Sequence, residues 1–423
     1  MLEENHIWHP YRQAKTAPKP ILIDRADGCY LFTKDGRKIF DGISSWWINV
    51  HGHCNSYISE AIAKQAKQLN QVVFANFTHE KAIELAKMVT DKAPSNLKKV
   101  FFSDNGSTAV EIALKMAYQY WQQKNQPRSK FIVLDNSYHG DTIGAMSVSS
   151  RSVFNKPFWP LMFEVISTKT ACISHMDPQE SLKKALLNLE NILQNNQNNI
   201  AGIIIEPMLQ AAGGMIVWPS GFLKNIKKLS VQYNTLLIAD EVMTGFYRTG
   251  SYFACEHEDV KPDLMCLSKG LSGGFLPLAL TLATDDIYQA FYHDQKSQAF
   301  LHGHTFTANP ISCAAAVASM ELFEKPKIKQ NISELVLAIK NNLQIFINHP
   351  KLKNARSLGG VGIIELNDQN AGYSSSLAES IYEKALAQGL YIRPLGNIIY
   401  FMPPLCAQTH EIEWAFSIIK SCL

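Results

Sequence analysis

The sequence predicts an α/β protein built on a mostly parallel β-sheet with helices on both faces. From about residue 98, amphipathic stretches alternate with short apolar runs at residues 100–102, 131–134, 203–205, 236–238 and 264–267. Strands that are apolar on both faces and separated by helical patterns are typical of a buried parallel sheet. Each run stops at a polar cluster, and ligands of open α/β sheets bind outside the carboxyl ends of the strands. We therefore expect one crevice at that edge.

The composition indicates a globular chain that acts on small molecules. It has 423 residues, of which 46% are hydrophobic, and a formal net charge of +3. A chain of this length is expected to form two or more lobes. The small charge, without a Lys/Arg cluster, argues against nucleic acid or an anionic membrane as a partner. No apolar run approaches the roughly 18 residues of a membrane span, and no targeting segment is expected at the N-terminus.

Cysteine and histidine spacing gives no sign of a metal or of disulfides. The eight cysteines are spread along the chain without a CxxC pair. This spacing favours reduced thiols, and hence a cytoplasmic protein, over zinc ribbons or a disulfide framework. Two His-x-His pairs, at residues 51–53 and 302–304, are too poor in neighbouring ligands to indicate a metal, and we expect none.

Both ends of the chain carry short β patterns outside the main series. Residues 28–32 and 35–42 are typical of a hairpin, and a second β region is expected around residues 362–364 and 398–401. These ends would form a smaller lobe. The expected division is an N-terminal segment at 1–50 that contributes to the small domain, a large ligand-binding domain at 51–310 and a C-terminal small domain at 311–423.

The polar cluster at residues 103–108 follows a predicted strand and opens a helix. Gly106 would allow close backbone approach, and free N–H groups with the Ser107 and Thr108 hydroxyls would hold a phosphate, assisted by the helix dipole. An ordinary helix N-cap is the alternative.

Two further polar side chains end predicted strands. Asp240 follows residues 236–238, and Lys269 lies in a glycine-rich turn after residues 264–267. A loop lysine is usually solvated, but a phosphate site, a carboxylate and a lysine at neighbouring strand ends together fit a pyridoxal phosphate enzyme. A nicotinamide-dependent oxidoreductase is disfavoured, because the glycines at 270, 273 and 274 do not form the G-x-G-x-x-G fingerprint.

These motifs resemble those of the class III aminotransferases of fold type I. The likeness covers nearly the whole chain, in the stretches HIWHPY (6–11), DGISSWW (41–47), SDNGSTAVEIALKMA (103–117), YHGDTIGAMSVS (138–149), IIEPMLQAAGGM (204–215), ADEVMTGFYRTG (239–250), LSKGLSGG (267–274) and YIRPLGNIIYFMPPL (391–405). WHPY, SSWW and IRPLG are similar to the branch of the family that serves biotin synthesis. The resemblance implies a large domain with a mostly parallel seven-stranded sheet and a smaller α/β domain from both chain ends.

The resemblance also implies a role for each cofactor-binding residue. Lys269 becomes the Schiff-base lysine and Asp240 the partner of the pyridine nitrogen, while Gly106 and Ser107 become the phosphate cradle. Tyr138 would stack on the cofactor ring, where a phenol offers a flat apolar surface. Lys269, Asp240 and Tyr138 are the expected catalytic residues.

The stretch HGHTF implies a second subunit at the site. In the resemblance, His304 and Thr305 bind the cofactor phosphate of the neighbouring subunit, which implies a homodimer with active sites at its interface. His304 stands where adenosylmethionine-using members more often have proline.

Substrate binding is expected from Tyr11, Trp46, Tyr138, Lys269, Gly303 and Arg393. Arg393 would clamp the carboxylate of the keto acid, because a guanidinium fork matches a carboxylate bidentately. Many relatives that act on ω-amines instead carry arginine at the place of Tyr400.

The resemblance implies ping-pong transfer of the amino group of S-adenosylmethionine to 8-amino-7-oxononanoate, giving 7,8-diaminononanoate. Trp46 favours adenosylmethionine as the donor, and lysine is the alternative donor. Two further alternatives are another class III aminotransferase of ω-amines or diamines, and a non-catalytic cofactor-binding homologue.

Overall fold

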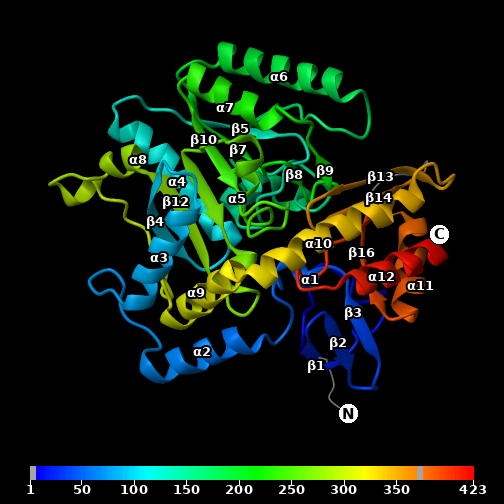
Figure 1. The fold of residues 1–423 in the computed structure, drawn as a ribbon. Coiled ribbons are helices and arrows are strands. Elements are labelled where there is room, and N and C mark those ends of the chain that lie inside the picture. The colour runs from blue at the N-terminus through cyan, green and yellow to red at the C-terminus, as the bar shows by residue number, and fades with distance from the viewer. Residues whose placement is uncertain (1–5, 369–374) are drawn as a thin grey trace.

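A seven-stranded sheet forms the centre of the molecule. The computed structural model describes residues 6–368 and 375–423 (Figure 1). The strand order is β4-β12-β11-β10-β7-β5-β6. The strands are β4 (Leu97–Ser103), β5 (Lys130–Leu134), β6 (Ile166–Thr168), β7 (Ile200–Ile205), β10 (Leu236–Asp240), β11 (Leu264–Leu267) and β12 (Ala279–Thr284). All pairs are parallel except those of β12, which is antiparallel to β11 and β4. The predicted mostly parallel sheet is confirmed.

The five apolar runs identified from the sequence lie in β4, β5, β7, β10 and β11. Every residue of β7, β10 and β11 is buried. The alternation expected of a strand covered on both faces is clear in β10: Leu236 and Ile238 pack with one buried cluster, and Leu237 and Ala239 with the other. Strands β6 and β12 lie outside the runs identified from the sequence.

Helices cover both faces of this sheet, as predicted. One cluster joins the sheet to α4 (Gly106–Gln123), α5 (Ile143–Ser147) and α8 (Asp285–Gln289). The other joins it to α3 (Glu80–Lys92), α6 (Pro178–Asn195), α7 (Phe222–Gln232) and α9 (Pro310–Glu324). Helix α2 (Ser56–Gln68) packs against α9. In α4 the apolar residues recur at helical spacing and are buried, which explains why the helix lies flat on the sheet.

Strands from both ends of the chain meet beside the large sheet. The predicted hairpin is confirmed as β2 (Tyr30–Thr33) and β3 (Lys38–Asp41), with β1 (Ile23–Asp27) on its outer side and β15 (Leu390–Tyr391) parallel to β3. A second sheet contains β13 (Leu352–Leu358), β14 (Val361–Leu366), β17 (Ile398–Phe401) and β16 (Arg393–Leu395). In Figure 1 the blue strands lie next to the orange and red C-terminal elements.

The remaining α-helices and β-strands complete this region. They are α1 (Ser44–Trp47), α10 (Pro326–Asn342), α11 (Ser376–Ala387), α12 (Thr409–Cys422) and the two-stranded sheet of β8 (Leu209–Gln210) and β9 (Ile216–Val217). The domain boundaries given above stay a prediction. In the described part of the chain, no helix combines the length and apolar character that crossing a bilayer requires.

Candidate active site

The five polar clusters converge on one cavity at the carboxyl ends of the strands. Its volume is about 490 Å³, and its lining includes residues that follow β4, β5, β7, β10 and β11, namely Asn105, Gly106, Ser107, Tyr138, Glu206, Asp240 and Lys269. The crevice expected from the sequence is therefore present.

Lys269 stands at the end of β11 with its amine toward this cavity. Its Nζ lies 4.5 Å from the centre of the Trp47 ring. Burial lowers the pKa of Lys269 to about 8, although the carboxylates of Asp240 and Glu206 act in the opposite direction. A lysine with a lowered pKa has more neutral amine near neutral pH, which suits a nucleophile and a proton carrier.

Asp240 ends β10 and is held by two donors. Its Oδ2 lies 2.7 Å from His139 Nδ1, and its Oδ1 accepts a hydrogen bond of 3.1 Å from the Val242 amide. Both side chains of the Asp240–His139 pair are buried. The carboxylate is thus fixed in orientation at the floor of the cavity.

The sequence did not single out His139 or Glu206 as site residues. Glu206 accepts hydrogen bonds from the backbone amides of Tyr138 (3.0 Å) and Ala211 (3.1 Å), and burial raises its pKa to about 7. Both residues lie in polar clusters recognised from the sequence. Only the contacts in the folded chain separate them from their polar neighbours.

The N-terminus of α4 lines part of the cavity. Asn105 caps the helix by accepting from the Thr108 amide at 3.1 Å, and Thr108 Oγ1 accepts from the Asn105 amide at 3.1 Å. The first-turn amides of Gly106 and Ser107 have no helical acceptor and line the cavity. The expectation that the Thr108 hydroxyl faces a phosphate is wrong, because the capping box uses that hydroxyl.

Gly106 and Gly140 bring this loop into close contact with its neighbours. A Cβ atom on residue 106 would lie 2.6 Å from Val242 Cγ1, and one on residue 140 would collide with the Ser107 hydroxyl. Only glycine permits both approaches, so the cradle at the helix terminus depends on these two positions.

A second cavity of about 430 Å³ adjoins the first and shares Trp47, Tyr138, Gly140 and Lys269 with it. Its lining also includes Tyr11, Trp46, Asp141, Arg393 and Tyr400. The Arg393 guanidinium lies 4.6 Å from the centre of the Trp46 ring, and the rings of Trp46 and Tyr11 are 5.4 Å apart. Residues from both ends of the chain thus form a pocket that leads to Lys269.

Tyr11 and Tyr138 meet Asp141 in this second cavity. The Tyr11 hydroxyl donates a hydrogen bond to Asp141 Oδ2. Desolvation, together with the Asp141 carboxylate, raises the pKa of Tyr11 to about 12, and desolvation raises that of Tyr138 further. Both phenols therefore stay protonated near neutral pH.

Three predicted residues lie outside both cavities of their own chain. Gly303 and Thr305 are exposed, and the Thr305 carbonyl accepts from Gln71 Nε2 at 3.0 Å. His304 Nδ1 lies 2.7 Å from Asp104 Oδ2, an ion-pair distance. Their predicted roles at a neighbouring subunit's site stay a prediction.

The residues present fit pyridoxal phosphate. The N-terminus of α4, a buried carboxylate and a lysine with a lowered pKa all line the first cavity. These are the three groups that hold this cofactor's phosphate, ring nitrogen and aldehyde carbon.

Comparison with known proteins agrees with this site. Residues 11–423 match the class-III aminotransferase family, so the chain belongs to the class III aminotransferases, a family that uses pyridoxal phosphate. The chain is 44% identical to the adenosylmethionine-8-amino-7-oxononanoate aminotransferase of Synechococcus elongatus over 421 residues, which cover 99% of this chain and 98% of that protein.

Solved structures give the same result for the fold. A crystal structure of adenosylmethionine-8-amino-7-oxononanoate aminotransferase from Methanocaldococcus jannaschii has a TM-score of 0.93 and 36% identity, and covers 99% of this chain and 96% of that one. An amine transaminase from an uncultivated Pseudomonas species, solved with pyridoxal phosphate bound, has a TM-score of 0.94 and 31% identity, with 99% and 98% covered. The fold is therefore that of a pyridoxal phosphate transaminase.

Proposed function

We propose that this protein transfers the amino group of S-adenosylmethionine to 8-amino-7-oxononanoate, giving 7,8-diaminononanoate for biotin synthesis. The observation that carries the proposal is the second cavity, which connects Lys269 to Arg393. An elongated keto acid fits a cavity in which Lys269 belongs to the lining shared with the first cavity and Arg393 to the part that is not shared. Relatives named for this reaction, with 34–44% identity over nearly the whole chain, support the assignment.

The chain's own residues hold the cofactor and move the proton. When bound, pyridoxal phosphate supplies an electron sink and a carrier for the amino group. Gly106 and Ser107 would bind its phosphate through backbone amides, and Asp240 would hold its ring nitrogen in the protonated form. Lys269 would hold the cofactor, and its Nζ, whose pKa is lowered, would accept and return the proton of the substrate carbon.

Arg393, Trp46 and Tyr11 orient the acceptor. Arg393 binds the carboxylate, and among the residues that the structure describes no acidic side chain forms an ion pair with it. Tyr400 occupies the place where many ω-amine relatives carry arginine, and its hydroxyl accepts from Trp47 Nε1 at 3.1 Å. With tyrosine at this place, the arginines that line the second cavity are Arg151 and Arg393, and Arg393, which packs on Trp46, is the one assigned to the carboxylate of the longer acceptor.

The assembly proposed is a homodimer with shared active sites. Thr305 is exposed and lies outside both cavities of its own chain, which supports a role for it in a second copy. The eight free thiols support a cytoplasmic location, where thiols are kept reduced.

The absorbance of the cofactor tests the reaction directly. S-adenosylmethionine alone is expected to convert the pyridoxal form to the pyridoxamine form, and 8-amino-7-oxononanoate is expected to reverse the change. Conversion of the pyridoxal form by lysine but not by S-adenosylmethionine would keep 8-amino-7-oxononanoate as the proposed acceptor and make lysine the donor. No response to either donor, with a response to an ω-amine, would replace the proposal by the ω-amine alternative. The Lys269→Ala variant is the control, because it retains the pocket but lacks the amine.

A further inference from the structure

The pocket wall that carries Trp46 and Trp47 has an unusual backbone. The segment 42–47 connects β3 to the cavity, and its residues Ser44, Ser45 and Trp47 have φ values of 52°, 60° and 69°. Side-chain-bearing residues rarely adopt positive φ, and they keep it only where their surroundings hold them. The wall therefore depends on contacts outside the pocket.

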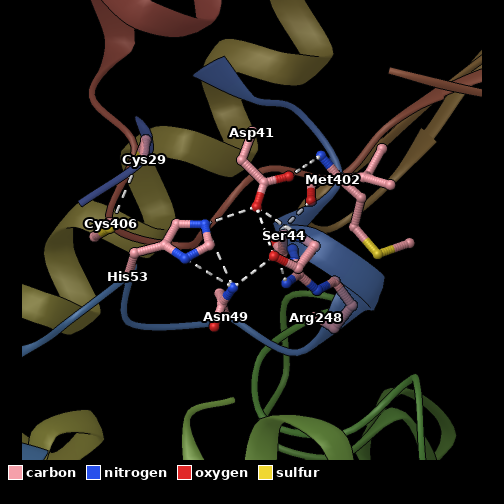
Figure 2. A network of polar contacts seen from close by, with 10 residues as sticks. Cys29, Asp41, Ser44, Asn49, His53, Arg248, Met402 and Cys406 are labelled. Atoms are coloured by element: carbon pink, nitrogen blue, oxygen red, sulfur yellow. Dashed lines mark hydrogen bonds and ion pairs between the residues drawn. The ribbon is translucent and has the colours of Figure 1, made fainter. Parts of the chain in front are cut away.

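Asp41 provides the most direct of these contacts (Figure 2). Its side chain is fully buried. Oδ2 accepts from the Ser45 amide at 2.6 Å and from Ser45 Oγ at 3.2 Å, and Oδ1 accepts from the Ile43 amide at 3.3 Å. His53 Nε2 lies 2.8 Å from Oδ2. Both carboxylate oxygens thus bind backbone amides at the start of the segment.

A second layer of contacts surrounds Ser44 and Ser45. Asn49 Nδ2 donates to Ser45 Oγ at 2.9 Å, and Ser44 Oγ donates to the Met402 carbonyl at 2.8 Å. Arg248 is buried and donates from Nη2 to Ser44 Oγ at 3.2 Å. Figure 2 shows these side chains directed toward the same turn. The turn is therefore fixed to the chain beyond β17 as well as to β3.

The fixed turn sets the position of two aromatic rings. Trp46 contacts Arg393 and Tyr11, and Trp47 lies over Lys269 and donates to Tyr400. Asp41 itself lines neither of the two cavities. Any influence of its carboxylate on substrate passes through the segment 42–47.

We propose that Asp41 is a positioning residue for the acceptor: its carboxylate holds the turn that places Trp46 against Arg393. This inference rests on the proposed function, because it assigns Trp46 and Arg393 to acceptor binding. Asp41 lines neither cavity, so it is assigned no part in proton transfer.

The test is Asp41→Asn in the cofactor-loaded enzyme. In either orientation of the asparagine amide, an NH₂ group faces the N–H of Ile43 or of Ser45, so the turn loses at least one hydrogen bond. KM for the acceptor is expected to rise about tenfold with kcat changed less than about twofold, the pattern expected when ground-state and transition-state binding are lost together. A lower kcat at unchanged KM would overturn the proposal.

Asp263→Asn is the matched control. Asp263 Oδ2 likewise accepts from a backbone amide, that of Leu237, at 2.8 Å. Leu237 lies near the start of β10, whereas the cavity lies at the other end of this strand, where Asp240 stands. This control is expected to lower thermal stability without changing KM. An equal rise of KM in both variants would overturn the proposal, because it would show that a general loss of stability is enough to raise KM.

A double-mutant cycle with Trp46→Ala tests the route of the effect. If Asp41 acts through the Trp46 wall, Asp41→Asn adds little to KM in the Trp46→Ala background, and additive effects would contradict this. Ser45→Ala is the milder second variant should Asp41→Asn fold poorly, and it is expected to raise KM in the same direction. An unchanged KM in Ser45→Ala would count against the proposal.

A crystal structure of Asp41→Asn without substrate gives a readout independent of activity. Ser44, Ser45 and Trp47 are expected to leave positive φ, and the Trp46 ring is expected to move away from Arg393. An unchanged segment would overturn the inference. Failure of the wild-type enzyme to use the acceptor would instead remove the proposed function, while this structural comparison would still decide whether Asp41 holds the turn.

Discussion

At the scale of single residues, the electrostatics of the cavity depend on three buried or half-buried groups. Asp240 is oriented by His139 at 2.7 Å, Glu206 has a pKa raised to about 7 by burial, and Lys269 has one lowered to about 8. Burial disfavours the charged form of each isolated group, so the lysine and Glu206 shift in opposite directions. The side chain of Asp240 is held in one orientation by His139 and by the Val242 amide.

Asp240→Asn is expected to keep the fold and to slow the half-reaction by at least about a hundredfold, because an amide cannot stabilise a protonated ring nitrogen as a carboxylate does. Single-turnover absorbance measures the rate, and thermal unfolding checks the fold. Asp263→Asn is the control, because it removes a carboxylate next to the sheet but outside both cavities. It should leave the rate of the half-reaction unchanged. Full activity of Asp240→Asn would remove Asp240 from its assigned role.

The raised pKa of Glu206 predicts that the free energy of unfolding depends on pH. Its folded pKa of about 7 exceeds the ordinary 4.5, so between these values the folded protein retains a proton that the unfolded chain has released. The free energy of unfolding therefore falls as pH rises from 4.5 to 7, by at most about 3 kcal/mol for this group. Urea unfolding of the cofactor-free protein across this range should show a flatter profile for Glu206→Gln. Identical slopes in both proteins would exclude the raised pKa.

At the scale of elements, α4 connects folding to cofactor binding. Its apolar stripe fixes the helix on the sheet, and its capping box leaves the first-turn amides of Gly106 and Ser107 directed at the cavity. The alternatives of N-cap and phosphate site, both open in the sequence, are compatible, because the cap uses the side chains of Asn105 and Thr108 and leaves the backbone amides of Gly106 and Ser107 without a helical acceptor.

Asn105→Ala is expected to lower the free energy of unfolding by about 1 kcal/mol, the usual cost of removing an N-cap. It should also weaken binding of pyridoxal phosphate, since the cap orients the amides that hold its phosphate. Asn55 caps α2 by accepting from the Tyr57 amide at 3.1 Å, so Asn55→Ala is the matched control. Chemical denaturation and cofactor titration should show equal losses of stability but weaker cofactor binding only in Asn105→Ala.

At the scale of the whole molecule, the pocket is closed by segments that are far apart in the sequence. β15 pairs with β3, and Arg393 from β16 meets Trp46 from α1. The N-terminal segment and the C-terminal region thus form one wall together, which explains how a site at the strand ends acquires a substrate pocket from both chain ends.

The proposed dimer is tested by mixing two inactive variants. Lys269→Ala removes the amine, and Thr305→Arg is expected to block the partner's phosphate site. If sites are shared, a mixed dimer keeps one site with both wild-type residues, so refolding the two variants together should restore part of the activity. Purified mixed dimers that stay inactive would contradict a shared site. Sedimentation should give about twice the 47.4 kDa of the chain.

Much of the fold and several site residues could be predicted from local patterns. The runs that form β4, β5, β7, β10 and β11 are apolar over their whole length, and Lys269, Asp240 and Gly106 follow them directly. Strand β12, whose apolar residues follow a glycine-rich turn, is not identified from the sequence patterns. The antiparallel direction of β12 depends on its position in the sheet, between β4 and β11. No local sequence pattern encodes the position of β12 between these two strands.

The sequence by itself determined the chemistry available at the strand ends and the family to which the chain belongs, because both depend on residue type and spacing. Only the tertiary structure decided which groups meet: His139 with Asp240, Arg393 with Trp46, and Asp41 with the turn at residues 43–45. It also decided the pKa values of Lys269 and Glu206, because desolvation depends on what surrounds a group after the chain has closed.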